Sequence, residues 1–318
     1  WQPGMLPVLI KEQNKNDPFF NNFQFVLTIH NPAFKGIFDK YFLNNYYELS
    51  DELYDSGMVR FENAVSTLKS AIIYSQKIAT VSYTHRDELL ASNSEHGLSS
   101  VLELRRNDFV GIINGIDYAE FNPKADKAIK YVYNGVNVSK GKEENKRALL
   151  NHFNLEYRGQ PIFGLVSRLT WQKGIRLITA KTDFLIKNGA SLIILGSGEK
   201  ELEQQIEWLR SQYSDNIGIY IGYSSELAHL IYAGSDFFLM PSLFEPCGIG
   251  QMIAQRYGTL PIVRYTGGLK DTINGYNGYN LETANGIGFE YFDEEGMQYG
   301  LDLALRLYQD KEALLTIR

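Results

Sequence analysis

The C-terminal half of the chain alternates short apolar runs with stretches of helical periodicity. PIFGLVSRL precedes IRLITAKTDFLIKN, and ASLIILGSG precedes KELEQQIEWLRSQY, in which Leu202, Ile206 and Leu209 form one apolar stripe. The alternation continues with NIGIYIGY and SELAHLIYAG, with DFFLMPS and GIGQMIAQRYG, and with TLPIVRYT and GGLKDTING. Strands and helices that alternate at this spacing predict a parallel, doubly wound sheet, so we expect a Rossmann-like domain over residues 159–318.

The N-terminal third has the same two kinds of pattern in a less regular order. Apolar runs at 23–31, 77–82 and 108–115 predict buried strands, and residues 61–77 carry apolar residues at helical spacing. We therefore expect a partial Rossmann-like domain over residues 1–121. Residues 122–158 are rich in charge and lack a sustained apolar face, which is typical of an interdomain linker, with a helix from about Lys142. The predicted fold class is α/β with two Rossmann-like domains.

Length, composition and charge limit the classes of function. A chain of 318 residues with 44% hydrophobic content is long enough for about two domains. The net charge of −6 argues against a nucleic-acid partner, and no apolar run reaches the roughly 18 residues of a membrane span. The single cysteine, Cys247, predicts no intrachain disulfide and indicates a reducing, cytoplasmic location. The five histidines lack metal-type spacing, so we expect no metal site.

The first residues, WQPGMLPVLI, have neither a starting methionine nor the charged-then-apolar profile of a signal peptide. We interpret the chain as a fragment of a longer protein.

Candidate ligand-binding residues follow several of the predicted strands in the second domain. Arg168 and Lys173, in SRLTWQKG, offer a planar fork and a point charge to one anion. Glu245, in PSLFEPCGIGQM, lies where a strand gives way to a helix, and Gly267 and Gly268 begin a helix. Surface cations or a tight turn explain each motif alone. Together, on successive loops of one sheet, they predict a ligand with phosphate beside a hydroxyl-rich group.

Other motifs favour structural interpretations. LGSGEKE lacks the third glycine of a dinucleotide fingerprint, because Glu201 stands there, so a strand-to-helix turn is the better interpretation. A lone histidine such as His30 is more often structural than catalytic. Cys247 has no evident catalytic partners and is best interpreted as a small buried residue. Tyr223 suits stacking on a flat ring, but a half-buried tyrosine at a strand end explains it equally simply.

The motifs as a set resemble those of one family. VSRLTWQKG, PSLFEPCGIGQ and RYTGGLKDT, in this order, closely resemble bacterial glycogen synthases and plant starch synthases. TIHNPAFKGIF, KIATVSYTHRDEL and GIINGIDYAEFNP match the same family, and the resemblance extends from Trp1 to about Tyr308. It implies a GT-B fold, in which two Rossmann-like domains face each other across a cleft. The N-terminal domain is incomplete here, because the family's Lys-Thr-Gly-Gly-Leu loop is absent from the chain.

The resemblance also implies an activity and its partners. Members of the family transfer glucose from ADP-glucose or UDP-glucose to the non-reducing end of an α-1,4-glucan, with retention. The implied partners are therefore a nucleotide sugar and a glucan acceptor. No metal or other cofactor is implied, since Arg and Lys take the place of a cation at the diphosphate, in agreement with the absence of an Asp-x-Asp motif.

The resemblance assigns two sets of residues. The catalytic set is His30, Arg168, Lys173 and Glu245. The substrate-binding set comprises Asn31 and Asn114 near the cleft, Tyr223 against the base, Cys247, Gly248 and Ile249 around the sugar hydroxyls, and Thr266, Gly267 and Gly268 at the distal phosphate. Arg168 and Lys173 would grip the diphosphate, and Glu245 would face the positive charge that grows at the anomeric carbon. His30 and Asn31 would approach the sugar from the opposite domain.

Two alternatives remain open at the level of sequence. One is a retaining transferase of the same fold with a small-molecule acceptor, as in sucrose synthases. The other is a catalytically silent glucan-binding or nucleotide-binding scaffold. The complete Arg-Lys-Glu set argues against a silent parent protein, whereas the absent loop leaves the activity of this chain alone undecided. The sequence distinguishes neither adenine from uracil nor one oligomeric state from another.

Overall fold

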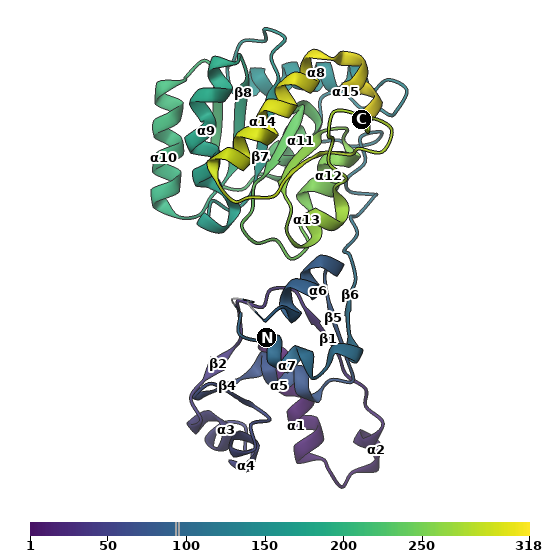
Figure 1. Cartoon of the computed structure of the whole chain (residues 1–318), viewed down its shortest axis with the longest axis vertical. Coiled ribbons are helices and arrows are strands. Elements are labelled where there is room, and N and C mark those ends of the chain that lie inside the picture. Colours follow the sequence, from purple (N-terminus) through teal and green to yellow (C-terminus); the bar gives the residue numbers. More distant parts are fainter. Residues whose placement is uncertain (93, 95) are drawn as a thin grey trace. The chain divides into compact units, whose positions relative to one another are not determined.

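The chain divides into two compact units. A computed structural model describes residues 1–92, 94 and 96–318, which group into Trp1–Ile113 and Asn114–Arg318 (Figure 1). Each unit has its own buried apolar clusters, in which side chains from strands and helices pack together. Both units are α/β, as the sequence predicts.

The first unit contains two small sheets. Its parallel sheet has the order β1-β5-β6, with β1 Val26–Ile29, β5 Lys77–Thr80 and β6 Phe109–Gly111, all within the predicted runs. An antiparallel sheet has the order β2-β4-β3, with β2 Ile37–Phe38, β4 Ala64–Ser66 and β3 Arg60–Phe61. The helices and 3-10 turns are η1 Gln2–Met5, α1 Leu6–Gln13, α2 Pro18–Asn21, α3 Tyr41–Asn45, α4 Glu52–Asp55, α5 Thr67–Tyr74, α6 Tyr83–Leu90, α7 Ser99–Glu103 and η2 Arg106–Asp108.

Two predictions for this unit need correction. The predicted helix over 61–77 begins only at Thr67, because the residues before it form the β3-β4 hairpin. Ser66 sets this start, since its side chain accepts a hydrogen bond from the Lys69 N–H, as an N-cap does. The strand β1 is buried on one face alone, where Ile29 lies, whereas Val26 is 70% exposed. β1 is an edge strand of the three-stranded sheet, and Val26 and Thr28 lie on its exposed face.

The second unit is built on one parallel sheet of six strands. Its order is β12-β11-β10-β7-β8-β9. The strands are β7 Ile162–Val166, β8 Ser191–Gly196, β9 Ile217–Ile221, β10 Phe237–Met240, β11 Leu260–Arg264 and β12 Ile287–Phe289. The order runs outward from β7 in one direction and from β10 in the other, so it reverses between these two neighbours. Ligands of doubly wound sheets bind at this switch point, at the carboxyl ends of the strands.

Helices cover both faces of this sheet. One face carries α9 Ile175–Lys187, α10 Lys200–Gln212 and α14 Glu294–Gln309, and the other carries α8 Val138–His152, α11 Ser225–Gly234 and α12 Gly250–Arg256 (Figure 1). The remaining elements are η3 Trp171–Lys173, α13 Gly267–Thr272 and α15 Lys311–Ile317. Within the described part of the chain, no helix is both long enough and apolar enough to cross a membrane.

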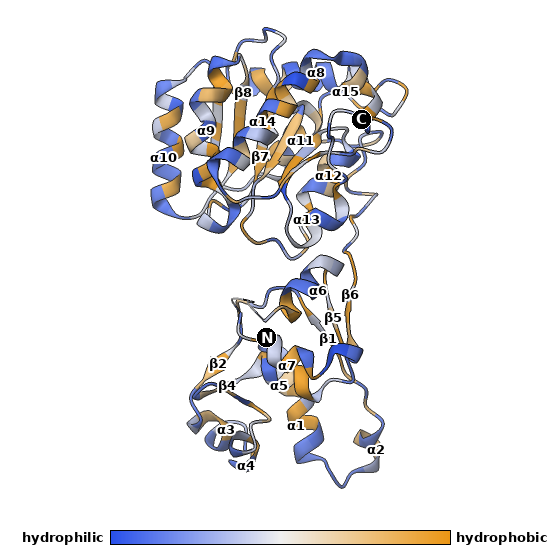
Figure 2. Ribbon diagram, viewed as in Figure 1, coloured by the Kyte–Doolittle hydropathy of each residue, from blue (hydrophilic) through white to orange (hydrophobic). Residues whose placement is uncertain are grey.

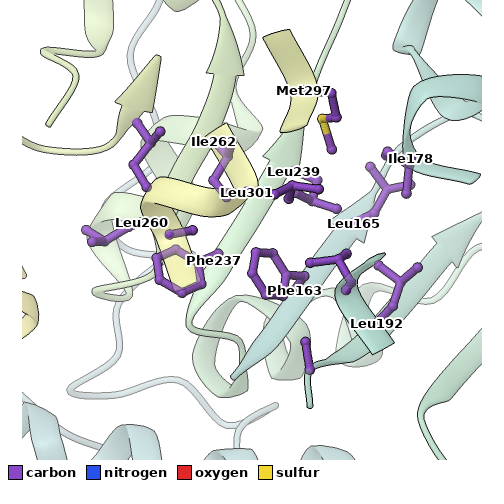
Figure 3. Close-up of a cluster of buried hydrophobic side chains, with 14 of the residues drawn as sticks. Phe163, Leu165, Ile178, Leu192, Phe237, Leu239, Leu260, Ile262, Met297 and Leu301 are labelled. Atoms are coloured by element: carbon purple, nitrogen blue, oxygen red, sulfur yellow. The ribbon is translucent and has the colours of Figure 1, made fainter. Parts of the chain in front are cut away.

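The main core lies between the sheet and the α9-α10-α14 face. Phe163 and Phe237, on the neighbouring strands β7 and β10, stack with ring centroids 5.1 Å apart, and Leu301 of α14 packs against the same cluster (Figure 3). The strands are mainly hydrophobic along their length, whereas α10 carries both polar and apolar residues (Figure 2). Full burial of such a leucine or phenylalanine contributes about 1.5–3 kcal/mol, and this packing holds the strand ends in place.

Residues 122–158, for which the sequence predicts a linker, lie within the second unit. α8 begins at Val138, earlier than predicted, and packs against α11. Asp126 is buried and pairs with His229 of α11, with 2.7 Å between the carboxylate oxygen and Nδ1. Lys142 is also buried, and its Nζ donates to the Tyr232 carbonyl at 3.1 Å. The charged residues of this segment thus include several that are paired inside the unit, which sequence pattern alone does not reveal.

Asp236, which directly precedes β10, is the centre of a buried ionic network. Its carboxylate lies 2.7 Å from Lys146 Nζ and 2.8 Å from Arg318, and it accepts a hydrogen bond of 2.9 Å from the Ile162 N–H. Burial acts to raise the pKa of Asp236, but the charges of Lys146 and Arg318 outweigh it, so the pKa is lowered. The network therefore stabilises the fold above the unfolded-state pKa, and this contribution is lost as the pH falls through the folded-state pKa.

We predict that Asp236→Asn lowers the free energy of unfolding by about 3–5 kcal/mol, because it leaves the buried Lys146 without its charge partner. Urea unfolding at neutral pH measures the loss. Asp183→Asn is the matched control, since Asp183 pairs with Lys187 on the surface and such pairs contribute little. Equal stability of the two variants would contradict a structural role for the network.

Candidate active site

The predicted charged residues meet at the switch point of the second unit. Arg168 follows β7 and Glu245 follows β10, and these strands are paired, with Phe237 opposite Phe163. A cavity of about 290 Å3 opens there and is lined by Arg168, Lys173 and Glu245 together with the Gly248–Gly250 backbone. The structure therefore brings together the three charged residues that the sequence singles out in this domain.

Lys173 and Glu245 form a direct ion pair. The Lys173 Nζ and a Glu245 carboxylate oxygen are 2.5 Å apart, and both side chains are largely buried, at 18% and 10% exposure. The Ser242 hydroxyl donates to the same carboxylate oxygen at 3.1 Å. Sequence reasoning places both residues at one site but does not predict this contact, because 72 positions separate them. The pair fixes a carboxylate and a cation side by side at the cavity.

Arg168 differs from Lys173 in its surroundings. Its side chain is exposed, and among the described residues its guanidinium has neither a hydrogen bond nor an ion pair. An unpaired guanidinium at the rim of a cavity is available to a ligand anion, for which its planar fork provides paired donors. Arg168 is thus ready for an anion in this structure, whereas Lys173 must first leave Glu245.

Side chains from neighbouring loops hold the segment that carries Glu245. Arg264, at the end of β11, donates from Nε to the Ser242 carbonyl at 2.8 Å and from Nη2 to the Leu243 carbonyl. Gln172 donates from Nε2 to the Phe244 carbonyl at 3.0 Å. Sequence reasoning missed both residues. A single arginine at a strand end and a single glutamine in a turn carry no distinguishing local signal.

The Arg168 loop rests on the turn after β8. A β-carbon on Gly196 would lie 2.0 Å from the Ser167 carbonyl oxygen, and one on Gly198 would lie 2.1 Å from that of Leu169. The Leu169 N–H also donates to the Ser197 carbonyl at 2.9 Å. Only glycine allows so close an approach of two backbones. The Gly-Ser-Gly sequence is therefore a structural turn that supports the Arg168 loop, in line with its interpretation from sequence.

The loop of residues 245–250, which carries Glu245, is in contact with the Gly267–Gly268 turn at the start of α13. A β-carbon on Gly267, which has φ +44°, would lie 2.0 Å from the Glu245 carbonyl oxygen, and one on Gly268 would lie 2.3 Å from that of Cys247. Thr266, the N-cap residue of α13, is buried beside them. The Gly268 N–H donates to the Pro246 carbonyl at 3.1 Å. Its predicted contact with a phosphate therefore requires this hydrogen bond to open.

The Cys247 thiol belongs to the loop that carries Glu245 and is buried. Burial raises its pKa, although a hydrogen bond from the Asn114 backbone and the nearby charge of Glu245 also act on it. The hydrogen bond places the Asn114 backbone beside this loop, and the role of Asn114 in substrate binding stays a prediction. Ile249 is 46% exposed and lines the cavity. The interpretation of Cys247 as a buried residue is confirmed.

Three predicted residues are not among those that line this cavity. Tyr223 follows β9, is 88% exposed rather than half-buried, and is not among the residues that line the cavity. His30 and Asn31 belong to the first unit, directly after β1. His30 is exposed, and the Asn31 side chain accepts a hydrogen bond of 3.0 Å from the Ala33 N–H. The roles of these three residues in substrate binding stay predictions.

The arrangement supports charge stabilisation. Two cations at a strand-end cavity stabilise a leaving group that gains negative charge, and a fixed carboxylate stabilises a positive centre beside it. Within the described part of the chain, no group of three or more His, Cys, Asp or Glu side chains is gathered in a way that would hold a metal ion.

Two family models match the chain. The model of the starch synthase catalytic domain matches residues 1–104, and that of glycosyl transferases group 1 matches residues 160–290. The glycogen synthase of Clostridium beijerinckii is 44% identical over 313 residues, covering 98% of this chain and 65% of its own length. That of Anoxybacillus flavithermus is 41% identical over 318 residues, covering 100% and 65%. The chain thus spans slightly less than two thirds of these relatives.

Solved structures give the same result. The catalytic domain of starch synthase IV from Arabidopsis thaliana, bound to ADP and acarbose, is 31% identical with a TM-score of 0.89, covering 98% of this chain and 66% of that one. A glycosyltransferase from Rickettsia africae, at 17% identity and a TM-score of 0.59 over 98% of this chain and 72% of its own, shows the shared fold alone. The fold class is the GT-B class of glycosyltransferases. The chain belongs to the glycogen synthase and starch synthase family.

Proposed function

We propose that the protein transfers glucose from a nucleotide sugar to the non-reducing end of an α-1,4-glucan, with retention. The observation that carries the proposal is the Lys173–Glu245 ion pair beside Arg168 in one cavity at the switch point. The similarity to glycogen synthases and to a starch synthase supports it. Because the chain spans only 65% of these relatives, the activity is proposed for the full-length protein of which this sequence forms part.

The positive and negative side chains have different roles when the glycosidic bond breaks. As the bond from C1 to the phosphate oxygen breaks, its electrons leave with the diphosphate, and Arg168 and Lys173 stabilise the growing negative charge. The acceptor hydroxyl then bonds to C1, and its proton passes to the departing diphosphate. Lys173 exchanges its Glu245 partner for the diphosphate, so that the carboxylate turns to the sugar. The two cations supply the positive charge at the leaving group, and we propose that no metal or other cofactor is required.

ADP-glucose is the donor that we propose. The related starch synthase IV, at 31% identity, was solved with ADP bound. UDP-glucose is the alternative donor. The buried free thiol of Cys247 agrees with a reducing compartment, which supports a cytoplasmic location.

Release of ADP from ADP-glucose in the presence of a maltooligosaccharide tests the proposal, for this chain and for the full-length protein in parallel. Release that requires the acceptor and lengthens it is the expected result. Release with fructose in place of the glucan would indicate a sucrose-synthase-like transferase. Nucleotide binding without any release by the full-length protein would indicate a silent scaffold and would contradict the proposal.

We predict that Lys173→Ala lowers turnover by roughly a hundredfold or more, because it removes a charge that acts mainly in the transition state. Steady-state kinetics of the full-length protein measure the loss. Lys181→Ala is the matched control, since Lys181 is equally exposed, at 18%, and pairs with Glu294 at 3.0 Å outside the cavity. If the Lys173→Ala variant had the same turnover as this control, the role of Lys173 at the leaving group would be contradicted.

We predict that the Cys247 thiol reacts with iodoacetamide at pH 8 more than about tenfold more slowly in the native protein than in denaturant. Burial raises its pKa, so little thiolate is present, and the buried sulfur is shielded from the reagent. Mass spectrometry of the alkylated protein over time measures both rates. Equal rates would show that the loop between Glu245 and Ile249 is open in solution.

A further inference from the structure

Gln251 is a fully buried polar residue directly behind the cavity. It lies on α12, has 0% exposure and is not among the residues that line the cavity. Its side-chain nitrogen, Nε2, lies 3.1 Å from the carbonyl oxygens of both Cys247 and Gly248. Two carbonyl oxygens accept only from a donor, so they fix the orientation of the amide.

Gln251 also connects to the Gly267–Gly268 turn. Its Nε2 lies 3.1 Å from the Thr272 hydroxyl oxygen, and that hydroxyl donates to the Gly268 carbonyl at 2.6 Å. Hydrogen bonds thus run from the Cys247–Gly248 backbone through two side chains to the Gly267–Gly268 turn. One buried amide ties together the two loops on which the proposed sugar and phosphate contacts depend.

The direction of these hydrogen bonds determines where the opposite sides of the peptide groups point. In a planar trans peptide the C=O and the N–H point in opposite directions. The carbonyls of Cys247 and Gly248 point at Gln251, so the N–H groups of Gly248 and Ile249 point away from it, and both residues line the cavity. Within the described part of the chain, neither N–H has a hydrogen-bond partner.

We propose that Gln251 is a positioning residue that aims the Gly248 and Ile249 N–H groups into the cavity and couples this loop to the Gly267–Gly268 turn. The proposal rests on the proposed function, because the ligand of these N–H groups is the donor sugar nucleotide. Gly248 has φ +73°, a left-handed conformation, and the Gln251 amide donates to its carbonyl and so helps to hold this conformation. Preorganised donors act most strongly in the transition state, so the effect should fall on turnover.

The test replaces Gln251 by methionine, which has nearly the same length but cannot donate. We expect Gln251→Met to lower kcat by about tenfold or more, with the KM for ADP-glucose changed far less. Gln255→Met is the matched control. Gln255 lies one turn further along the same helix and donates to two backbone carbonyls, those of Asn285 at 3.2 Å and Thr272 at 3.5 Å. Among the described residues it has no hydrogen bond to the Cys247–Gly248 backbone or to the Thr272 hydroxyl that links the two loops. A Gln251→Met variant with the kcat of this control would overturn the proposal.

A second pair of variants covers the case in which Gln251→Met does not fold. Thr272 is only partly buried, so its replacement is milder. Thr272→Val removes the hydroxyl link and should lower kcat severalfold, whereas Thr272→Ser keeps the hydroxyl and should restore it. Equal turnover of the valine and serine variants would contradict the coupling of the two loops.

Hydrogen exchange separates this proposal from the proposed function. In the ligand-free protein, Gln251→Met should speed amide exchange over residues 247–250 and at Gly268, whose N–H donates to the Pro246 carbonyl, and Gln255→Met should not. Unchanged exchange there would overturn the positioning role whatever the activity. If the wild-type protein shows no turnover with any donor, the proposed function fails, and the exchange comparison still decides the role of Gln251.

Discussion

The buried ion pair between Lys173 and Glu245 is the interaction on which the site depends. Removing one partner of such a pair leaves an uncompensated charge in a poorly solvated place, at a cost of several kcal/mol. The structure therefore holds both partners closely. Arg264 and Gln172 fix the backbone before Glu245, and the turn that carries Lys173 packs against the same segment. In the proposed function, the diphosphate takes the place of Glu245 beside Lys173, and the positive charge at the sugar takes the place of Lys173 beside Glu245.

Close backbone contact between successive loops makes this arrangement rigid. Among the described residues of the second unit, a β-carbon would come within 2.3 Å of a carbonyl oxygen in a neighbouring segment at Gly174, Gly196, Gly198, Gly267 and Gly268. Each lies at the end of a strand, in the loop after it, or at the start of the helix that follows, near the carboxyl end of the sheet. The glycines are thus explained by packing between loops, and the same packing positions Arg168, Lys173 and Glu245 at the cavity. Rigidity of this kind lets fixed charges act without reorganisation.

Sequence pattern predicted much of the second unit because its signals are local. The alternating strands and helices from β7 to α13 follow from hydrophobic period and length, and Arg168, Lys173 and Glu245 stood out because they follow strands. The strand β12 and the helix α14 were not predicted. The helix α8 begins at Val138, before its predicted start, and packs against α11 within the second unit.

The contacts within the site could not be predicted from the sequence, because they depend on how distant segments fold together. The ion pair and the support from Arg264, Gln172 and Gln251 join segments that are up to 72 positions apart, or join side chains to backbone carbonyls that no residue type reveals. The residue type at a motif position indicates only that the residue belongs to the site. The direction of its hydrogen bonds, which decides whether it contacts the ligand or positions a neighbour, comes from the folded backbone.

A crystal structure of this chain with ADP tests the central claim most directly. The account predicts that the diphosphate accepts hydrogen bonds from Arg168 and Lys173 at the switch point between β7 and β10, with Lys173 no longer paired to Glu245. ADP bound elsewhere, or bound there with the Lys173–Glu245 pair intact, would contradict it.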